Sequence, residues 1–443
     1  MYVAVSSTET EDPQYLQQRK SSLKLVWLAY YNTTMRSSML LAAMASAVPI
    51  LANPVMKRDA TSTDDTFRDD PTGYMSGFKN PSITTSVGNK AICVQGMIDV
   101  TASATNYRIN LEEPNSKSAV VEIAVEALQT NSTARKQYVG AATPVDGTYG
   151  IYSQLCWPRA SDAINSTTVQ FLNHGAGFDR SYWNAAPGYS YVDFAADRGY
   201  TTFLFDRLGT GLSDHPDPLQ VVQYGIQVEI AHQLIRMLRA GRISNHAFSE
   251  VVAVGHSFGS IQLAGITSKY PRDVDAAVLT GFAADPSGMG VAFAGVGLTP
   301  ASISDPVLFG NLSTGYLTAS SIEGNQFFFF RYPNFDPAVL DLAQRSRQTL
   351  TLGEFFSLEG LEASPSFTGP VDIVNGLNDL PNCFGNCLLP YDKVAAAKEK
   401  LYPAASNGSD SYLAPDTGHG LNFHYTASEA YEHIHNFLRK NGF

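Results

Sequence analysis

The sequence predicts an α/β fold with a mostly parallel central β-sheet, and two patterns carry this prediction. From residue 168 onwards, short apolar runs alternate with segments of helical spacing, which is typical of strand–helix–strand units in a parallel sheet. Between about residues 81 and 157, strand-like runs instead follow one another with turn residues between them, which favours antiparallel pairing. We therefore expect N-terminal antiparallel strands that lead into a parallel sheet.

Each expected element follows from its local pattern. In the antiparallel region, three loosely alternating runs predict strands at 91–100, 119–128 and 148–155. In the parallel region, apolar runs predict strands at 169–172, 202–205, 251–254, 276–280 and 371–374. Apolar residues at helical spacing predict helices at 223–238, 260–270 and 427–439.

The alternation of strands and helices breaks between about residues 283 and 368. This segment contains four consecutive phenylalanines at 327–330, several Gly/Pro turns and a helical run from 337 to 347. We interpret it as an inserted helical cap, and an irregular extension packed on the sheet edge is the alternative. The phenylalanines fit either a hydrophobic core or a substrate pocket.

Composition limits the kind of partner. The 443 residues include 44% hydrophobic ones, with 24 Phe and 22 Tyr, which is enough for a sizeable core. The net charge of −11 argues against nucleic acid or an anionic membrane as a partner. We expect a small-molecule substrate instead.

The N-terminal region carries the pattern of a targeting signal. Met35-Arg36 precedes an apolar stretch at 39–51 that is rich in small residues and too short to span a bilayer, which favours a signal peptide over a stable membrane anchor. Lys57-Arg58 offers a dibasic processing site. We expect residues 1–58 to comprise an upstream extension, a signal peptide and a possible propeptide, and residues 59–80 to be a flexible N-terminus. An ordinary apolar patch with a disordered tail is the alternative.

Two further features agree with secretion. N-glycosylation motifs occur at Asn131, Asn165, Asn311 and Asn407. Four cysteines permit two disulfides, and the short spacing of the last two favours Cys383–Cys387, which leaves Cys93–Cys156. Four free buried thiols are the alternative. A zinc site is disfavoured because the sequence lacks C-x₂-C pairs and histidines close to the cysteines.

The most informative motif is Gly255-His256-Ser257-Phe258-Gly259. It follows the apolar run 251–254 and precedes the helical segment 260–270, so it predicts a nucleophile elbow, a sharp strand-to-helix turn that exposes a serine hydroxyl. Glycines on both sides leave room for the neighbouring strand and helix. The N–H of Phe258, at a helix N-terminus, is then expected to face a developing oxyanion.

A serine nucleophile needs a base and an acid that orients the base. Among nine histidines, we expect His419 to be the base because it lies in a glycine-flanked loop late in the chain, with His424 as the alternative. For the acid we expect Asp379, which follows the strand at 371–374, with Asp285 as the alternative. Both aspartates follow strands whose carboxyl ends form the catalytic edge.

The oxyanion hole needs a second N–H donor. Small residues follow the strand at 169–172 in His174-Gly175-Ala176-Gly177, and they let the backbone approach an oxyanion closely. We expect Ala176 to be this donor, with Gly177 as the alternative.

Together these motifs resemble the α/β-hydrolase superfamily. The resemblance covers about residues 165–443 and includes Asp206-Arg207-Leu208-Gly209-Thr210-Gly211, in which Asp206 resembles a structural turn residue. The chain is most similar to secreted fungal serine hydrolases of the esterase or lipase kind. The resemblance implies an α/β-hydrolase fold over residues 81–443 and ester hydrolysis through an acyl-enzyme, with no cofactor and no metal. The aromatic residues of the expected cap suggest an apolar or aromatic acyl or alcohol group in the substrate.

The same triad also serves peptidases, C–C bond hydrolases, haloperoxidases and some lyases, so these activities stay open. A secreted binding protein without catalytic activity is the alternative from another class. The intact set of serine, histidine and aspartate argues against it.

Overall fold

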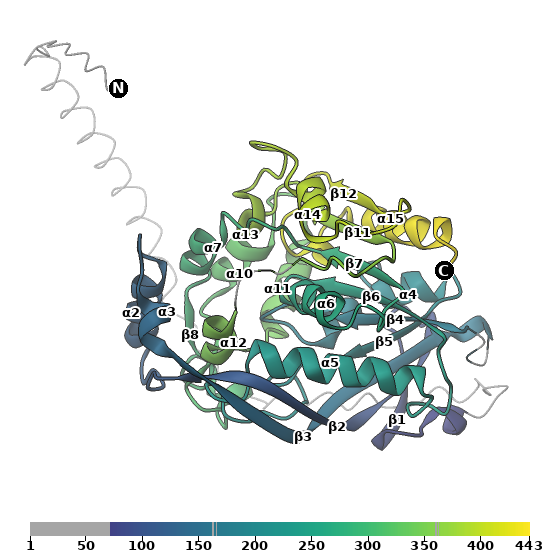
Figure 1. The fold of residues 1–443 in the computed structure, drawn as a ribbon, viewed down its shortest axis with the longest axis horizontal. Coiled ribbons are helices and arrows are strands. Elements are labelled where there is room, and N and C mark those ends of the chain that lie inside the picture. Colours follow the sequence, from purple (N-terminus) through teal and green to yellow (C-terminus); the bar gives the residue numbers. More distant parts are fainter. Residues whose placement is uncertain (1–70, 162–163, 165, 359–360, 362) are drawn as a thin grey trace, which may run out of the picture. The chain divides into compact units, whose positions relative to one another are not determined.

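A computed structural model describes residues 71–161, 164, 166–358, 361 and 363–443 (Figure 1). Within these residues the main sheet has nine strands in the order β1-β2-β3-β5-β4-β6-β7-β11-β12. Its first three strands and β5 pair antiparallel, and β5 to β12 pair in parallel, which confirms the predicted fold class. The strands are β1 (Lys79–Thr85), β2 (Ala91–Ile109), β3 (Val139–Pro158), β4 (Thr168–Asn173), β5 (Thr201–Phe205), β6 (Glu250–His256), β7 (Ala276–Thr280), β11 (Val371–Gly376) and β12 (Asp410–Ala414).

The central strands are buried on both faces, as parallel strands covered by helices must be. In β6, Val251 and Ala253 join one hydrophobic core, whereas Val252 and Val254 join the core on the other face. The first core contains residues of α5 (Tyr224–Arg239), α6 (Phe258–Lys269) and α14 (Lys393–Leu401), and the second contains residues of α4 (Tyr191–Ala196) and α15 (Ala427–Lys440). Helices therefore cover both faces of the sheet.

The strand predicted at 119–128 is wrong, because this segment forms helix α2 (Lys117–Leu128). The Ser116 side chain caps it by accepting a hydrogen bond from the N–H of Ala119. Its loosely alternating apolar residues suggested a strand. Val120 is nevertheless buried, with Ile123 and Ala127 partly buried below it, and this spacing is helical.

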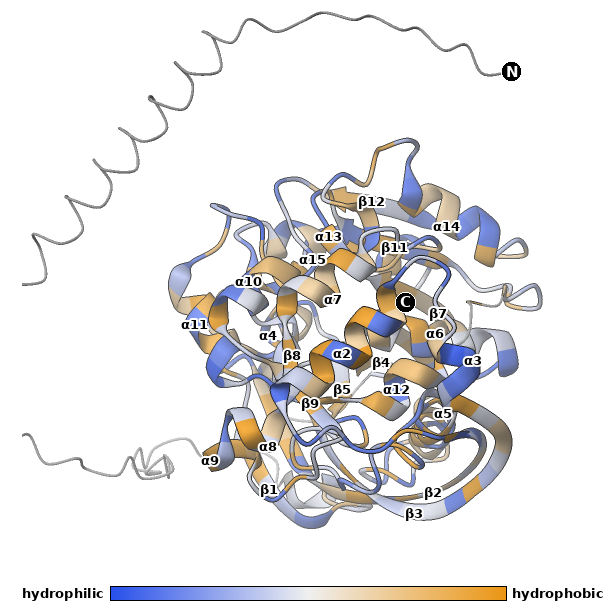
Figure 2. Cartoon of the chain, turned by 90° about the vertical axis from the view of Figure 1, so that its left-hand side faces the viewer, coloured by the Kyte–Doolittle hydropathy of each residue, from blue (hydrophilic) through white to orange (hydrophobic). Residues whose placement is uncertain are grey.

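The helix α2 is carried by a long two-stranded ribbon. The strands β2 and β3 pair from Ala91 and Pro158 as far as Ile109 and Val139, and α2 and α3 (Ala134–Tyr138) connect them. The ribbon brings α2 against α7 and β8 of the insertion described next. Figure 2 looks onto this side of the molecule, where α2 exposes Val121 and Val125.

The insertion between β7 and β11 is mainly helical, as predicted for the cap, but it also contains short strands that were not predicted. It contains a three-stranded antiparallel sheet of order β10-β9-β8 beside short helices. Strands of two to four residues are too short to leave a periodic signal in the sequence. The described elements are α7 (Met289–Val296), β8 (Leu298–Pro300), α8 (Ala301–Ser304), α9 (Pro306–Phe309), β9 (Tyr316–Ala319), α10 (Ile322–Phe329), α11 (Pro337–Arg345), β10 (Leu350–Thr351) and α12 (Leu352–Ser357).

At the N-terminal side, residues 71–80 of the segment expected to be flexible form the 3₁₀ helix η1 (Pro71–Tyr74) and the start of β1. The expected signal peptide, residues 59–70 and the glycosylation motif at Asn165 lie outside the described residues. Asn131, Asn311 and Asn407 are exposed. In the described part of the chain, every helix is too short or too polar to cross a bilayer.

Candidate active site

The nucleophile elbow lies where β6 ends and α6 begins. Ser257 has φ +52° and ψ −115°, a strained conformation for a residue other than glycine. A Cβ on Gly259 would lie 2.2 Å from the carbonyl oxygen of Asn173, and one on Gly255 would lie 2.7 Å from Cα of Ser260. Both glycines are therefore required by the backbone that crowds the turn.

Three residues from separate parts of the chain meet at this elbow. His419 Nε2 lies 2.8 Å from Ser257 Oγ, and His419 Nδ1 lies 2.7 Å from Asp379 Oδ2. Asp379 and His419 are almost completely buried, whereas Ser257 is partly exposed. The carboxylate accepts the Nδ1 hydrogen, which leaves Nε2 free to accept the serine proton. This is the geometry of a serine nucleophile with its base and orienting acid.

Asp379 follows β11 and caps the short helix α13 (Leu380–Cys383). Its Oδ1 accepts the backbone N–H of Asn382 at 2.8 Å, and its Oδ2 accepts the Asn382 side-chain amide at 3.0 Å. Asn382 also lines the pocket beside Ser257. The sequence interpretation missed Asn382, although an asparagine three residues after a capping aspartate is a usable signal for a shared hydrogen-bond network.

The two alternative residues have other roles. His424 Nε2 accepts the backbone N–H groups of Arg331 and Gly418, and its Nδ1 donates to the carbonyl of Gly420. Burial lowers the pKa of His424 to about 4, so the ring is neutral near pH 7. Its hydrogen bonds to Gly418 and Gly420 hold the loop that carries His419. Asp285 is largely exposed and lies 3.6 Å from the Lys393 ammonium group.

The loop after β4 lies against the nucleophile. An ideal Cβ on Gly175 would be 3.1 Å from Cβ of Ser257, so a side chain here would crowd the nucleophile. Ala176, Gly177 and Phe258 line the same pocket as Ser257. The Phe258 N–H is one of the first amides of α6, which have no acceptor within the helix. Both expected oxyanion donors are thus beside the nucleophile.

Two further histidines of the glycine motifs are buried next to this site. His256 stacks on Tyr182 with ring centroids 4.4 Å apart, and its Nδ1 lies 3.1 Å from the Thr280 hydroxyl. His174 Nε2 accepts the N–H of Arg207. Burial holds the pKa of both imidazoles well below the usual range. Both rings are therefore neutral supports of the elbow and of the loop after β4.

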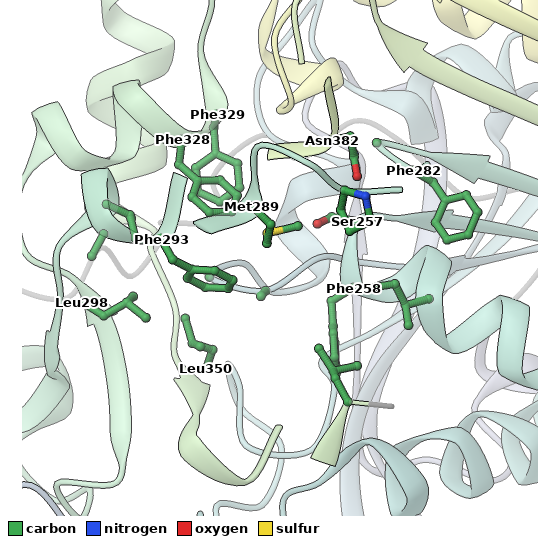
Figure 3. A pocket seen from close by; sticks show the side chains of 18 of the residues that line it. Ser257, Phe258, Phe282, Met289, Phe293, Leu298, Phe328, Phe329, Leu350 and Asn382 are labelled. Atoms are coloured by element: carbon green, nitrogen blue, oxygen red, sulfur yellow. The ribbon is translucent and has the colours of Figure 1, made fainter. Parts of the chain in front are cut away.

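Ser257 opens into a cavity of about 340 Å³ between the sheet edge and the insertion (Figure 3). Its walls are mainly apolar and include Phe258, Met289, Phe293 and Phe328. Of the four consecutive phenylalanines, Phe328 and Phe329 line the cavity and pack on His419, with ring centroids 5.5 and 5.8 Å away. Phe330 packs in the core, and Phe327 is exposed.

Both predicted disulfides are present in the structure. Cys93–Cys156 joins directly opposite residues of β2 and β3, and Cys383–Cys387 closes the loop that follows Asp379. In that loop, the Gly385 N–H donates to the carbonyl of Asp379 at 2.9 Å. No cluster of three or more metal-binding side chains occurs among the described residues.

The parallel sheet with a serine elbow at its carboxyl edge defines an α/β hydrolase. The chain belongs to the alpha/beta hydrolase family, whose model matches residues 171–434. No curated protein sequence matches the chain.

Solved structures of low sequence identity are also similar. A thermophilic esterase from Thermogutta terrifontis is 15% identical, with a TM-score of 0.44, over 67% of this chain and 96% of the esterase. The enol-lactonase from Burkholderia xenovorans is 16% identical, with a TM-score of 0.42, over 66% and 97%. An epoxide hydrolase from Vigna radiata is 14% identical, with a TM-score of 0.44, over 66% and 95%.

Proposed function

We propose that this protein is a serine hydrolase that cleaves a carboxylic ester of a small apolar molecule through an acyl-enzyme. The observation that carries the proposal is the continuous hydrogen-bonded line from Ser257 Oγ through His419 to Asp379, with spacings of 2.8 and 2.7 Å. The serine hydroxyl has a base beside it, and the base has a carboxylate that orients it.

In the first half of the reaction, Ser257 Oγ attacks the ester carbonyl carbon while His419 Nε2 takes the hydroxyl proton. The carbonyl oxygen becomes an oxyanion, which the N–H groups of Phe258 and Ala176 stabilise. Asp379 stabilises the imidazolium that forms and stays ionised. The tetrahedral species then collapses, and His419 returns the proton to the leaving alcohol.

In the second half, water replaces the alcohol. His419 Nε2 takes a proton from water as the water oxygen attacks the acyl carbon. Collapse of the second tetrahedral species breaks the bond to Ser257 Oγ, which regains its proton from His419. The products are a carboxylic acid and an alcohol, and the triad is restored.

The cavity supports an apolar substrate. Its volume of about 340 Å³ suits a small organic molecule, and aromatic and aliphatic side chains of the insertion form much of its wall. Burial of such a substrate removes apolar surface from water, which supplies binding energy. An ester with an apolar acyl or alcohol group fits this chemistry.

Covalent labelling tests the proposed mechanism. A fluorophosphonate should label the wild-type protein, and Ser257→Ala should abolish both labelling and hydrolysis of p-nitrophenyl esters while the thermal unfolding temperature stays close to that of the wild type. A matched panel of anilides then separates ester from amide cleavage. A folded wild-type protein that is neither labelled nor active would contradict the proposal and favour a binding protein.

We also propose that the protein is secreted. Two disulfides suit an oxidising compartment, and three exposed glycosylation motifs suit passage through the secretory pathway. The resemblance to secreted fungal hydrolases supports the same conclusion. N-terminal sequencing of protein from the culture medium tests it, and a mature product that still carries residues 35–45 would contradict the expected signal peptide.

A further inference from the structure

Gln348 connects the insertion to the loop that follows β4. It lies between α11 and β10 and lines the cavity. Its backbone N–H donates to the carbonyl of Gly177 at 2.9 Å, and its Nε2 donates to Asp179 Oδ2 at 3.1 Å. Two hydrogen bonds from one residue therefore hold the segment that begins directly after Ala176.

The side-chain amide of Gln348 is fixed in one orientation. Its Oε1 accepts the N–H of Gly211 at 3.0 Å, so the amide nitrogen faces a carboxylate and the amide oxygen faces a donor. Gly211 belongs to the loop after β5, where its φ of +57° suits glycine. One side chain thus connects two loops at the catalytic edge of the sheet.

The segment around Gln348 is itself well anchored. The Thr349 hydroxyl donates to the carbonyl of Gly209 at 2.6 Å, and the Thr318 hydroxyl donates to the carbonyl of Gln348 at 3.1 Å. Thr318 belongs to β9, so Gln348 is held by the small sheet of the insertion. Because the insertion fixes the position of Gln348, the hydrogen bonds of Gln348 can fix the position of the loop after β4.

Asp179 makes the contact with Gln348 energetically significant. Burial, and then the neighbouring Asp206, raise the pKa of the Asp179 carboxyl to about 6. A half-buried carboxylate depends on its donors, and those of Asp179 include the backbone N–H of Ser181 at 2.8 Å, the Ser181 hydroxyl and the amide of Gln348, with the charge of Arg180 nearby. Loss of the Gln348 amide would leave Asp179 with donors from Ser181 alone, within its own turn, and would remove the contact that ties this turn to the insertion.

We propose that Gln348 is a positioning residue that holds the Ala176 N–H in place for the oxyanion. This inference rests on the proposed function. An oxyanion develops only on the way to the tetrahedral species, so a displaced Ala176 N–H weakens the transition state more than the bound substrate. Gln348 acts through the loop and does not contact the oxyanion.

The test uses Gln348→Met, which keeps the length of the side chain in the cavity. The variant loses the two side-chain hydrogen bonds, to Asp179 and from Gly211, and keeps the backbone hydrogen bond to Gly177. We expect kcat to fall by about 10-fold or more with KM unchanged, which is less than the loss of a whole oxyanion donor. The affinity for an alkyl trifluoromethyl ketone, which forms a tetrahedral adduct, should fall by the same factor as kcat. Gln137→Met, at an exposed position of α3, is the matched control and should behave as the wild type.

A second variant keeps the test decisive if Gln348→Met does not fold. Asp179→Asn removes the carboxylate that accepts the Gln348 amide but keeps a side chain that caps the following turn. We expect it to lower kcat with unchanged KM, and the double variant to lose less than the product of the two single losses.

The outcomes separate the two proposals. A wild-type protein that shows neither labelling nor hydrolysis overturns the proposed function, and the inference with it. An active wild type with unchanged kcat in folded Gln348→Met overturns the inference alone, as does a rise in KM without a loss of kcat. If Asp179→Asn folds and Gln348→Met does not, a kcat of Asp179→Asn equal to that of the wild type overturns the inference.

Discussion

Asp379 accepts two hydrogen bonds from Asn382, one from its backbone N–H at 2.8 Å and one from its side-chain amide at 3.0 Å. The second bond ends on Oδ2, the oxygen that also faces His419 Nδ1. Asn382 thus holds the carboxylate in an orientation that keeps Oδ2 toward His419. The helix turn after β11 is therefore part of the catalytic arrangement.

The first prediction concerns the acid itself. Asp379→Asn should lower kcat by roughly 10³- to 10⁴-fold, because an amide can stabilise the wrong imidazole tautomer and cannot stabilise the imidazolium. Steady-state hydrolysis of a p-nitrophenyl ester measures this loss. Asp285→Asn, at the exposed alternative position, is the matched control and should keep wild-type kcat. Equal activity in both variants would contradict the role of Asp379.

The second prediction separates the two disulfides. Replacing Cys383 and Cys387 by serine should lower kcat by about 10-fold, because the loop that they close is hydrogen-bonded to Asp379 and small misplacements are costly. Replacing Cys93 and Cys156 by alanine should instead lower the free energy of unfolding by about 2–4 kcal/mol with unchanged kcat. Urea unfolding and ester kinetics on both variants measure the two effects. The same loss of kcat in both would refute this division.

The third prediction concerns acid sensitivity. Burial lowers the pKa of His435 to about 4, whereas an unfolded histidine titrates near 6.5. The unfolded chain therefore binds more protons between these pH values, and stability is lost as the pH falls through this window. At pH 5 this one residue should cost about 2 kcal/mol relative to pH 7.5.

Urea unfolding at the two pH values measures this cost in the wild type and in His435→Gln. The variant should be less stable at both pH values, because aromatic packing is lost, but its loss between pH 7.5 and pH 5 should be smaller. His435 lies on α15 and belongs to no part of the proposed mechanism, so kcat serves as the internal control. An identical decline in both proteins would show that His435 is protonated without cost.

The fourth prediction concerns the size of the cavity. Ala319 of β9 lines its wall in the insertion, and Ala319→Phe should fill this part of the cavity. The ratio kcat/KM for long-chain or aromatic esters should fall by about 10- to 100-fold, whereas acetate esters should be cleaved as before. A chain-length series of p-nitrophenyl esters measures the change. A uniform loss for all esters would mean that the substitution disturbs the triad instead.

Local sequence signals predicted seven of the nine described strands of the main sheet and the three residues that meet at the elbow, but they missed β1 and β12. The apolar runs before Ser257 and Asp379 predicted buried strands, and the glycine turns after them reflect backbone crowding that only glycine relieves. The structure brings Ser257, His419 and Asp379 within hydrogen-bonding distance, as the chain order suggested. Their catalytic role stays a proposal.

Contacts between distant segments could not be read from local patterns. Gln348 lies in a region without clear periodicity, and its significance appears only when the insertion folds against the loop after β4. The segment of helix α2 was predicted as a strand because its apolar residues alternate loosely between turn residues, whereas in the structure it is a helix that packs against β8 and α7.

The length of the β2–β3 ribbon sets how far α2 lies from the main sheet. A strand rises about 3.3 Å per residue, so adding two residues to each strand would move α2 by roughly 7 Å and away from α7. Met289 and Phe293 of α7 form part of the cavity wall, and α2 packs against α7. The length of the ribbon therefore determines whether α2 contacts this part of the wall. Substrate range in such chains could therefore diverge through insertions more than a hundred residues before the nucleophile, with the catalytic residues unchanged.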